Sequence, residues 1–491
     1  MSERGNDRAV VVGSGPNGLA AAIVLARAGV RVTVFEAEPV AGGGLRTEPL
    51  TLPGFIHDVC AAVFPMAVAS PFFREIDLGI DWRHPPISVA HPQEDGSEAA
   101  LALDFDATVA SLGEDGSAYR ALVGPLCRNA DAFIDDVLAP LHVPRHPLHL
   151  ARFGAHALRS AESIANRFHD ARTRALFAGC AAHAFMPLDL PFSSAMGLVL
   201  ALTAHAPGWP IPIGGAGRIA RALVACAERL GVEIVTDHRV THAGDLPAAR
   251  AYLFDVAPSR LADLAPHLPE RYRQKLRRFK MGPAAFKIDW ALSSPIPWRS
   301  PACRRAGTVH VGGTFEEVAE AERAIWSGAP PERPFIIVAQ PSLFDPTRAP
   351  IGKHVAWAYA HVPFGSELDW REVIEARIEA FAPGFKDAIF ERGVMSPATL
   401  EAHDENLVGG HIIGGVASLG QLFARPVSAI SPYTTPDASI FVCSASTPPG
   451  GGVHGMCGFH AARVALARRF GVVAKEEKRK DWRRARNVMA G

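Results

Sequence analysis

Short apolar runs flank a stretch of small residues near the N-terminus. Residues 9–12 are apolar and mostly β-branched, which predicts a buried parallel strand. Residues 19–28 are rich in Ala and Leu and predict a helix, which Gly29 would terminate. The apolar run 30–35 predicts a second strand that ends at Glu36. The pattern therefore predicts one strand–helix–strand unit.

The loop between the first strand and the helix has the spacing G-x-G-x-x-G. Its candidate cofactor-binding residues are Gly13, Gly15, Pro16, Asn17 and Gly18. Glycines at these positions allow a tight turn, a close approach to a diphosphate and close helix–strand packing, and the helix N-terminus attracts the diphosphate charge. Glu36 can accept hydrogen bonds from ribose hydroxyls and would repel the 2′-phosphate of NADP. The unit predicts a dinucleotide site and does not by itself distinguish NAD from FAD.

A second glycine cluster, residues 42–44, follows the ribose-binding acid. Glycines there keep the chain close to a diphosphate, and a neighbouring arginine can meet its charge. The candidate residues of this segment are Ala37, Gly43, Gly44 and Arg46.

A similar arrangement occurs near the C-terminus. Residues 439–443 predict an apolar strand and residues 459–470 predict a helix, with a glycine-rich loop between them. Such a loop suits the edge of a flavin ring and its ribityl chain. Its candidate cofactor-binding residues are Ser446, Gly451, Gly452 and Val453, and His454 is the candidate catalytic residue, expected to touch the ring or the substrate.

Both ends of the chain resemble the FAD-dependent oxidoreductases that include phytoene dehydrogenases, carotenoid isomerases and retinol saturases. The N-terminal match is the G-x-G-x-x-G loop, the acid, and the G-G pair with a nearby arginine; the C-terminal match is Ser446–Val453. The likeness covers most of the chain and is greatest for the bacterial branch similar to pyridine nucleotide-disulphide oxidoreductase domain-containing protein 2. It implies FAD as cofactor, and a backbone contact from Val240 to the adenine.

The resemblance also implies the fold class and the domain organisation. We expect an α/β protein whose Rossmann-type FAD-binding domain is similar to those of glutathione reductase and p-hydroxybenzoate hydroxylase, with an inserted substrate domain of antiparallel sheet and helices. The FAD domain would combine residues 1–75, 212–282 and 400–491, with strands at 232–240 and 251–256. Residues 76–211 would form a mostly helical cap. Residues 283–399 would supply strands at 286–290, 308–311, 335–340 and 354–361, and helices at 314–325 and 370–381.

The two inserts are expected to enclose an apolar small-molecule substrate. The candidate wall residues are Phe185, Met186, Phe192, Met196, Trp209, Trp290, Trp357 and Tyr359.

A second nucleotide site is an alternative at Gly215 and Gly217, which begin a G-x-G-x-x-A motif. Pro210 and Pro212 precede it, however, and prolines argue against the central parallel strand that such a site needs.

Composition excludes several other classes of protein. With 50 Lys and Arg against 50 Asp and Glu, no net charge favours nucleic acid. The seven cysteines are scattered, and there is no H-E-x-x-H or G-x-S-x-G motif, so we expect neither a metal site nor a serine nucleophile. The N-terminus lacks a signal-peptide pattern, and the longest apolar run, residues 195–204, is shorter than the ~20 residues of a spanning helix. We expect a cytoplasmic protein, with anionic lipid as a candidate contact of its basic segment 475–486.

Three functions fit these observations. The first is an FAD enzyme that desaturates, saturates or isomerises an apolar substrate, such as an isoprenoid or polyene, by hydride transfer at flavin N5. The second is an NAD(P)H-dependent flavin enzyme with two nucleotide sites. The third is a non-catalytic isoprenoid-binding escort protein, which would have lost the flavin loops that this chain keeps.

Overall fold

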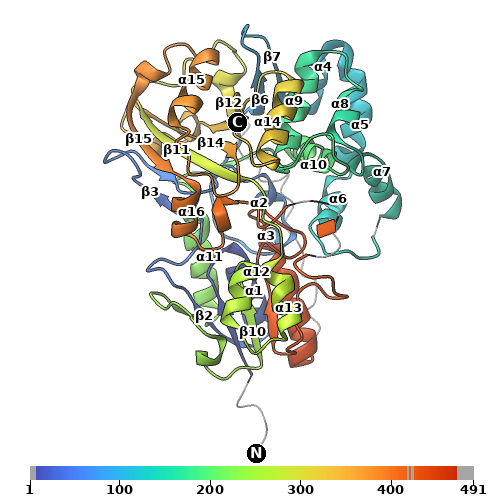
Figure 1. Cartoon of the computed structure of the whole chain (residues 1–491), viewed down its shortest axis with the longest axis vertical. Coiled ribbons are helices and arrows are strands. Elements are labelled where there is room, and N and C mark those ends of the chain that lie inside the picture. The colour runs from blue at the N-terminus through green and yellow to red at the C-terminus, as the bar shows by residue number, and fades with distance from the viewer. Residues whose placement is uncertain (1–6, 145, 417, 419, 422–424, 473–491) are drawn as a thin grey trace, which may run out of the picture.

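Two sheets organise the chain, and Figure 1 shows one below the other with most of the helical insert beside the upper one. The computed structural model describes residues 7–144, 146–416, 418, 420–421 and 425–472. The basic segment 475–486 lies outside these residues.

The lower sheet is entirely parallel and has the order β16-β10-β1-β2-β9. Its strands are β1 (Arg8–Val12), β2 (Arg31–Phe35), β9 (Glu233–Val235), β10 (Ala251–Phe254) and β16 (Ile440–Val442). Its helices are α1 (Pro16–Arg27), α11 (Gly217–Arg229), α12 (Pro258–Leu264), α13 (Glu270–Arg277) and α18 (Met456–Ala465). Ala9 and Val11 pack toward α1 and α18, whereas Val10 and Val12 pack toward α12. Burial on both faces explains the continuous apolar run, and the predicted strand–helix–strand unit is confirmed.

One strand of this sheet is shorter than the sequence predicts. The strand expected over residues 232–240 ends at Val235, because Asp237 takes a positive φ of 53°. Beyond it, the backbone N–H groups of Asp237 and His238 donate to the carbonyls of Glu38 and Glu36. Val240 therefore lies in a loop, packed against the cluster that contains Phe35.

The upper sheet has the order β15-β11-β14-β13-β12-β6-β7. Its strands are β6 (Ile87–Pro92), β7 (Glu98–Ala102), β11 (Ala284–Leu292), β12 (Ala306–Val311), β13 (Ile336–Ala339), β14 (His354–Val362) and β15 (Ile389–Met395). All neighbours are antiparallel except β12 and β6. The four strands predicted in the second insert are present. Strands β6 and β7 come from the insert expected to be mostly helical, and β6 is buried along its whole length, so its sequence lacks alternation.

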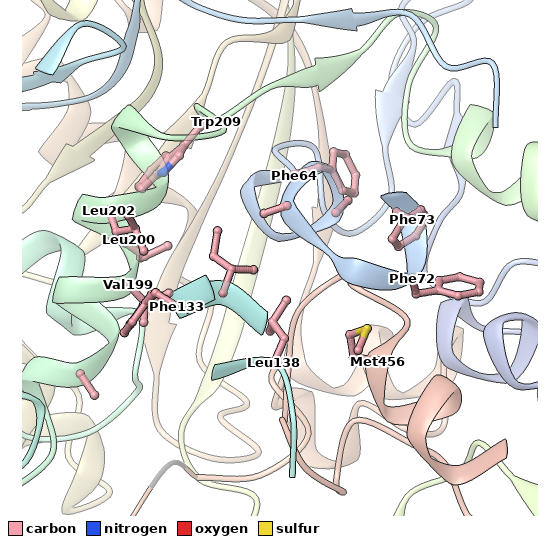
Figure 2. Packing of buried hydrophobic residues seen from close by; sticks show 14 of the residues in the cluster. Phe64, Phe72, Phe73, Phe133, Leu138, Val199, Leu200, Leu202, Trp209 and Met456 are labelled. Atoms are coloured by element: carbon pink, nitrogen blue, oxygen red, sulfur yellow. The ribbon is translucent and has the colours of Figure 1, made fainter. Parts of the chain in front are cut away.

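The helical part of the first insert packs against β6 and β7 of the upper sheet and reaches α18 of the lower domain, where His460 Nε2 lies 3.0 Å from the Leu138 carbonyl oxygen. Its helices are α4 (Phe105–Ser111), α5 (Gly116–Arg128), α6 (Ala130–Val137), α7 (Pro147–Ala157), α8 (Ala161–Ala165), α9 (Ala171–Ala182) and α10 (Ser194–His205). Figure 2 shows where this cap meets the lower domain: Leu138 and α10 residues such as Leu200 belong to the same buried cluster as Phe72 and Met456.

Further helices and strand pairs complete the fold. They are α2 (Pro65–Ala69), α3 (Pro71–Glu75), α14 (Phe315–Trp326), α15 (Arg371–Phe381), α16 (Pro397–His403) and the strand pairs β3 (Thr47–Glu48) with β4 (His57–Asp58) and β5 (Trp82–Arg83) with β8 (Ile211–Pro212). Of these, α14 and α15 belong to the second insert.

A buried ion cluster ties the second insert to the lower domain. Arg348, fully buried, donates to Asp58 Oδ2 and Asp345 Oδ2, both at 2.8 Å. The two carboxylates in turn accept the backbone N–H groups of Ala216 and Gly214, each at 2.7 Å. Arg348 thus holds in place the loop that begins α11.

We predict that Arg348→Met lowers the free energy of unfolding by about 3–5 kcal/mol, since it leaves two carboxylates buried without their cation. Urea denaturation followed by tryptophan fluorescence measures this change. Arg371→Met is the control, because the Arg371–Asp369 ion pair is exposed and water screens it. Equal midpoints for the two variants would contradict the role given to Arg348.

Candidate functional site

The fingerprint loop has the tight geometry that its glycines predict. Gly13 has a φ of 95°, and a Cβ on Gly18 would lie 2.0 Å from the Gly13 carbonyl oxygen. Only glycine fits at position 18 with the helix this close to the strand.

Glu36 is buried at the end of β2 and holds this loop. Its Oε2 accepts hydrogen bonds from the backbone N–H of Ser14, at 3.0 Å, and from the Ser14 hydroxyl. Its Oε1 accepts the backbone N–H of Glu38 at 3.0 Å. The carboxylate predicted to bind ribose therefore also orders the diphosphate loop.

The second glycine cluster lies against the first. A Cβ on Gly43 would lie 2.9 Å from the Cα of Gly15, and one on Gly42 would lie 2.6 Å from Ala220 of α11. Close by in the sequence, Arg46 has a buried Nε with no hydrogen-bond partner. An unsatisfied guanidinium nitrogen here fits an anionic group such as a diphosphate.

The C-terminal loop meets the N-terminal one. A Cβ on Gly458 of α18 would lie 1.8 Å from the carbonyl oxygen of Asn17, so the first turns of α1 and α18 touch backbone to backbone. Asn17 Oδ1 and Ser444 Oγ are buried and have no hydrogen-bond partner. Unsatisfied polar atoms at this junction fit a polar ligand.

These loops bound one end of a cavity of about 400 Å³. The predicted cofactor residues that line it are Gly15, Pro16, Asn17, Gly44, Ser446, Gly451, Gly452 and Val453. The others predicted from the two N-terminal motifs lie on the same loops outside the lining: Gly13, Gly18, Glu36, Ala37, Gly43 and Arg46. The structure thus brings together motifs from both ends of the chain.

The other walls of the cavity come from both inserts and are mostly apolar. Of the predicted wall residues, Trp209, Trp357 and Tyr359 line it. The remaining ones do not: Phe185, Met186, Phe192, Met196 and Trp290. Trp290 of β11, for example, is fully buried on the face of the upper sheet that is turned away from the cavity, and its ring centroid lies 5.1 Å from that of Phe385.

An aspartate at the end of β10 was missed by sequence reasoning. Asp255 is buried, lines the cavity and accepts the backbone N–H of Gly18 through Oδ2 at 2.7 Å. Burial raises its pKa to about 8, and the nearby Asp404 and Glu36 add to this effect. A single acid after an apolar run matches no sequence motif, so sequence reasoning had no basis for selecting Asp255. Its position at the carboxyl end of a parallel strand is nevertheless the place where ligands bind in α/β sheets.

A buried cation also lines the cavity. Lys287 on β11 forms an ion pair with Asp289, and its Nζ lies 5.9 Å from the centre of the Trp357 ring. Asp289 Oδ1 lies 3.4 Å from Nδ1 of the buried His57. One ammonium group is thus held among apolar side chains.

His454, the predicted catalytic residue, is not among the residues that line the cavity. It is buried, and its Nδ1 accepts the backbone N–H of Met456 at 3.0 Å while its Nε2 lies 3.1 Å from the Gly450 carbonyl oxygen. Both ring nitrogens thus lie within hydrogen-bond distance of backbone atoms of the C-terminal loop itself. The neighbouring Gly452 and Val453 line the cavity, and a catalytic role for His454 stays a prediction.

In the alternative nucleotide motif at Gly215 and Gly217, backbone N–H groups already bond to side chains of the protein. The N–H of Ala216 donates to Asp58 Oδ1, and that of Gly217 donates to Thr47 Oγ1 at 2.8 Å. The strand before it, β8, pairs antiparallel with β5 outside the parallel sheet. A carboxylate already sits where a nucleotide phosphate would bind.

Among the residues that the structure describes, no group of three or more His, Cys, Asp or Glu could hold a metal ion. Within the same residues, no helix is both long and apolar enough to span a bilayer.

The chain is similar in sequence to several known proteins. The NAD(P)-binding Rossmann-like domain family matches residues 11–76. Pyridine nucleotide-disulfide oxidoreductase domain-containing protein 2 of Rattus norvegicus is 26% identical over 93% of both chains. Phytoene dehydrogenase of Streptomyces griseus is 28% identical over 85% of this chain and 86% of its own.

Among solved structures, an oxidoreductase from Methanosarcina mazei has the same fold, with a TM-score of 0.60 and 15% identity over 94% of this chain and 100% of its own. The Rossmann-like domain and these relatives indicate a flavin or nucleotide cofactor. By sequence and fold, the chain is a homologue of the FAD-dependent oxidoreductases that include phytoene dehydrogenase and pyridine nucleotide-disulfide oxidoreductase domain-containing protein 2.

Proposed function

We propose that this protein binds FAD and desaturates, saturates or isomerises an apolar substrate, of the isoprenoid or polyene class, by hydride transfer at flavin N5. One observation carries the proposal: a single cavity has the glycine loops of both chain ends at one side and apolar side chains of both inserts at the other. A cofactor and an apolar molecule in such a cavity would be in contact.

The residues present fit FAD. The loop at residues 13–18 and the buried end of α1 would hold the diphosphate, with Arg46 supplying charge, and Glu36 would accept the ribose hydroxyls. Ser446 and the backbone of residues 451–453 would hold the ring side. Bound FAD would supply the hydride acceptor or donor, which no side chain in the cavity can do.

The apolar walls support the substrate class. Aromatic and aliphatic residues from both inserts line the cavity, among them Leu200, Trp209, Ile337 and Trp357. A long apolar molecule would bury its surface there, whereas a small polar substrate would find few partners. The similar phytoene dehydrogenase is named for a substrate of this class.

The other two functions find less support. Asp58 and Thr47 fill the second nucleotide motif, which weighs against a separate NAD(P)H site. Both flavin loops are intact and converge on the cavity, which weighs against a non-catalytic escort protein. Cytoplasmic location and contact of residues 475–486 with anionic lipid stay predictions.

We predict that the purified protein is yellow and releases FAD on denaturation. Chromatography of the released cofactor with a visible spectrum of the intact protein checks this. Release of FMN or a nicotinamide nucleotide, or no binding of FAD on reconstitution, would contradict the proposal.

A second prediction concerns Glu36. Glu36→Ala should weaken FAD binding by roughly 1–3 kcal/mol, or about 5- to 150-fold, because it leaves hydroxyls of the ribose and the Ser14 N–H unpaired. Fluorescence titration of the apoprotein with FAD measures the affinity. Glu38→Ala is the matched control, since Glu38 is an acid two residues away whose carboxylate pairs with the exposed Arg239. An affinity for FAD that is the same in both variants would remove Glu36 from the site.

A third prediction separates the one-nucleotide and two-nucleotide enzymes. Anaerobic mixing with NADH or NADPH should not reduce the bound flavin rapidly, since Asp58 and Thr47 occupy the second motif; dithionite serves as the positive control. Rapid bleaching by either nucleotide, lost in Gly217→Val while FAD stays bound, would instead establish a second nucleotide site.

A further inference from the structure

The carboxyl group of Asp255 lies at the N-terminus of α1. Its Oδ2 accepts the backbone N–H of Gly18 at 2.7 Å, and a Cβ on Gly15 would lie 3.0 Å from the same oxygen. Gly18 is the third residue of the helix, so its N–H has no partner within α1, and the N-cap residue Gly15 has no side chain that could accept it. The cap comes instead from the end of β10, the strand that pairs with β1.

This end of the helix opens into the cavity. Gly15, Pro16, Asn17 and Asp255 all line it. Asn17 is only 5% exposed, and its Oδ1 has no hydrogen-bond partner, which indicates a polar ligand at this place. Among the described residues, the Asp255 carboxyl makes no hydrogen bond besides the one from Gly18, so its Oδ1 is available to the same ligand.

The groups that face the Asp255 carboxyl are acids and thiols. Glu36 at the end of β2 and Asp404 after α16 act on it with the same sign of charge. Cys443 at the end of β16 and Cys457 on α18 also face it. Burial raises the pKa of Cys457 to about 11 and that of Cys443 well above its usual range, so neither thiol is charged near neutral pH.

Asp255 is therefore a carboxylic acid, and not a carboxylate, at neutral pH. Burial raises its pKa to about 8; Asp404 and Glu36 act in the same direction, and the hydrogen bond from Gly18 acts in the opposite one. A protonated carboxyl has one oxygen that accepts and one O–H that donates. Because Oδ2 accepts the Gly18 N–H, the proton lies on Oδ1.

A helix cap alone does not require an acid here. Asparagine or serine would accept the Gly18 N–H without placing a third carboxyl beside two others. A diphosphate at this helix end accounts for the acid, because the N–H groups and the helix dipole attract the diphosphate, whereas an ionised Asp255 would repel it. A neutral Asp255 instead donates a charge-assisted hydrogen bond to a phosphate oxygen.

We propose that Asp255 holds the diphosphate of FAD as a neutral acid, with Oδ2 on the Gly18 N–H and the Oδ1 proton donated to a phosphate oxygen. This inference rests on the proposed function, and within it on FAD as the cofactor. Binding of FAD is then coupled to protonation of Asp255. The affinity for FAD falls as the pH rises through the pKa of Asp255 in the FAD-free protein, and below that pKa this group leaves the affinity unchanged.

The first test is fluorescence titration of the apoprotein with FAD at about pH 7 and about pH 9. The wild type should bind FAD about tenfold more weakly at the higher pH, because only about one Asp255 in ten is protonated one unit above its pKa. Asp255→Asn should bind FAD with the same affinity, within about twofold, at both pH values. Its amide accepts the Gly18 N–H, donates to a phosphate oxygen and does not ionise.

Asp404→Asn is the matched control, since Asp404 is a second acid that lines the cavity. The substitution removes a negative charge that raises the pKa of Asp255, so the fall in affinity should persist and begin at a lower pH. Loss of the pH dependence in Asp404→Asn, with the dependence retained in Asp255→Asn, would assign the proton to Asp404 and overturn the proposal.

The second test is calorimetry of FAD binding at the higher pH in buffers that differ in their enthalpy of ionisation. The wild type and Asp404→Asn should take up about half a proton or more for each FAD bound, and Asp255→Asn should take up none. If the wild type binds FAD equally well at both pH values and takes up no proton, the role of Asp255 is overturned while FAD remains the cofactor. If the apoprotein binds no FAD at either pH, the cofactor assignment fails, and the role of Asp255 falls with it.

Discussion

The contact between Asn17 and Gly458 constrains the whole molecule. A side chain at position 458 would collide with the Asn17 carbonyl oxygen, so the helices that follow the first and last glycine loops begin at one point. Both inserts lie between these two residues in the sequence, so the chain must leave the lower sheet for each insert and then return to it. The two inserts are therefore built on one side of this junction, and the cavity is the space between them and the loops. A single close backbone approach thus decides where cofactor and substrate can meet.

The sequence predicted those strands, helices and loops whose pattern is complete within one short segment of the chain. The unit from Ala9 to Glu36 and the loop before α18 were recognisable because glycine spacing, apolar runs and an acid agree within short segments. Strand β6 was missed because its partner β12 is far away in the sequence and because β6 is buried on both faces, and β7, which pairs with β6, was missed with it. The end of β9 was missed because it depends on the positive φ of Asp237 and on its bonds to the chain after β2.

The polar side chains that line the cavity were less predictable than its glycine-rich loops. Asp255, Lys287 and His183 each stand alone in the sequence, and only tertiary packing brings them to one cavity. The reverse holds at Gly215, where a glycine motif is present and the fold gives its N–H groups to Asp58 and Thr47. A motif predicts what a backbone can bind, whereas the neighbours that fold against it decide what it does bind.

The edge strand β16 has a consequence for how the chain is made. It pairs with β10, from which it is separated by the entire second insert. Because synthesis runs from the N-terminus, the edge of β10 stays open while the second insert completes the upper sheet, and the loop at residues 444–453 follows only after it. An open strand edge is a template for pairing with other chains. A nascent or truncated chain that lacks β16 is therefore exposed to aggregation, and cofactor capture becomes the final step of biogenesis.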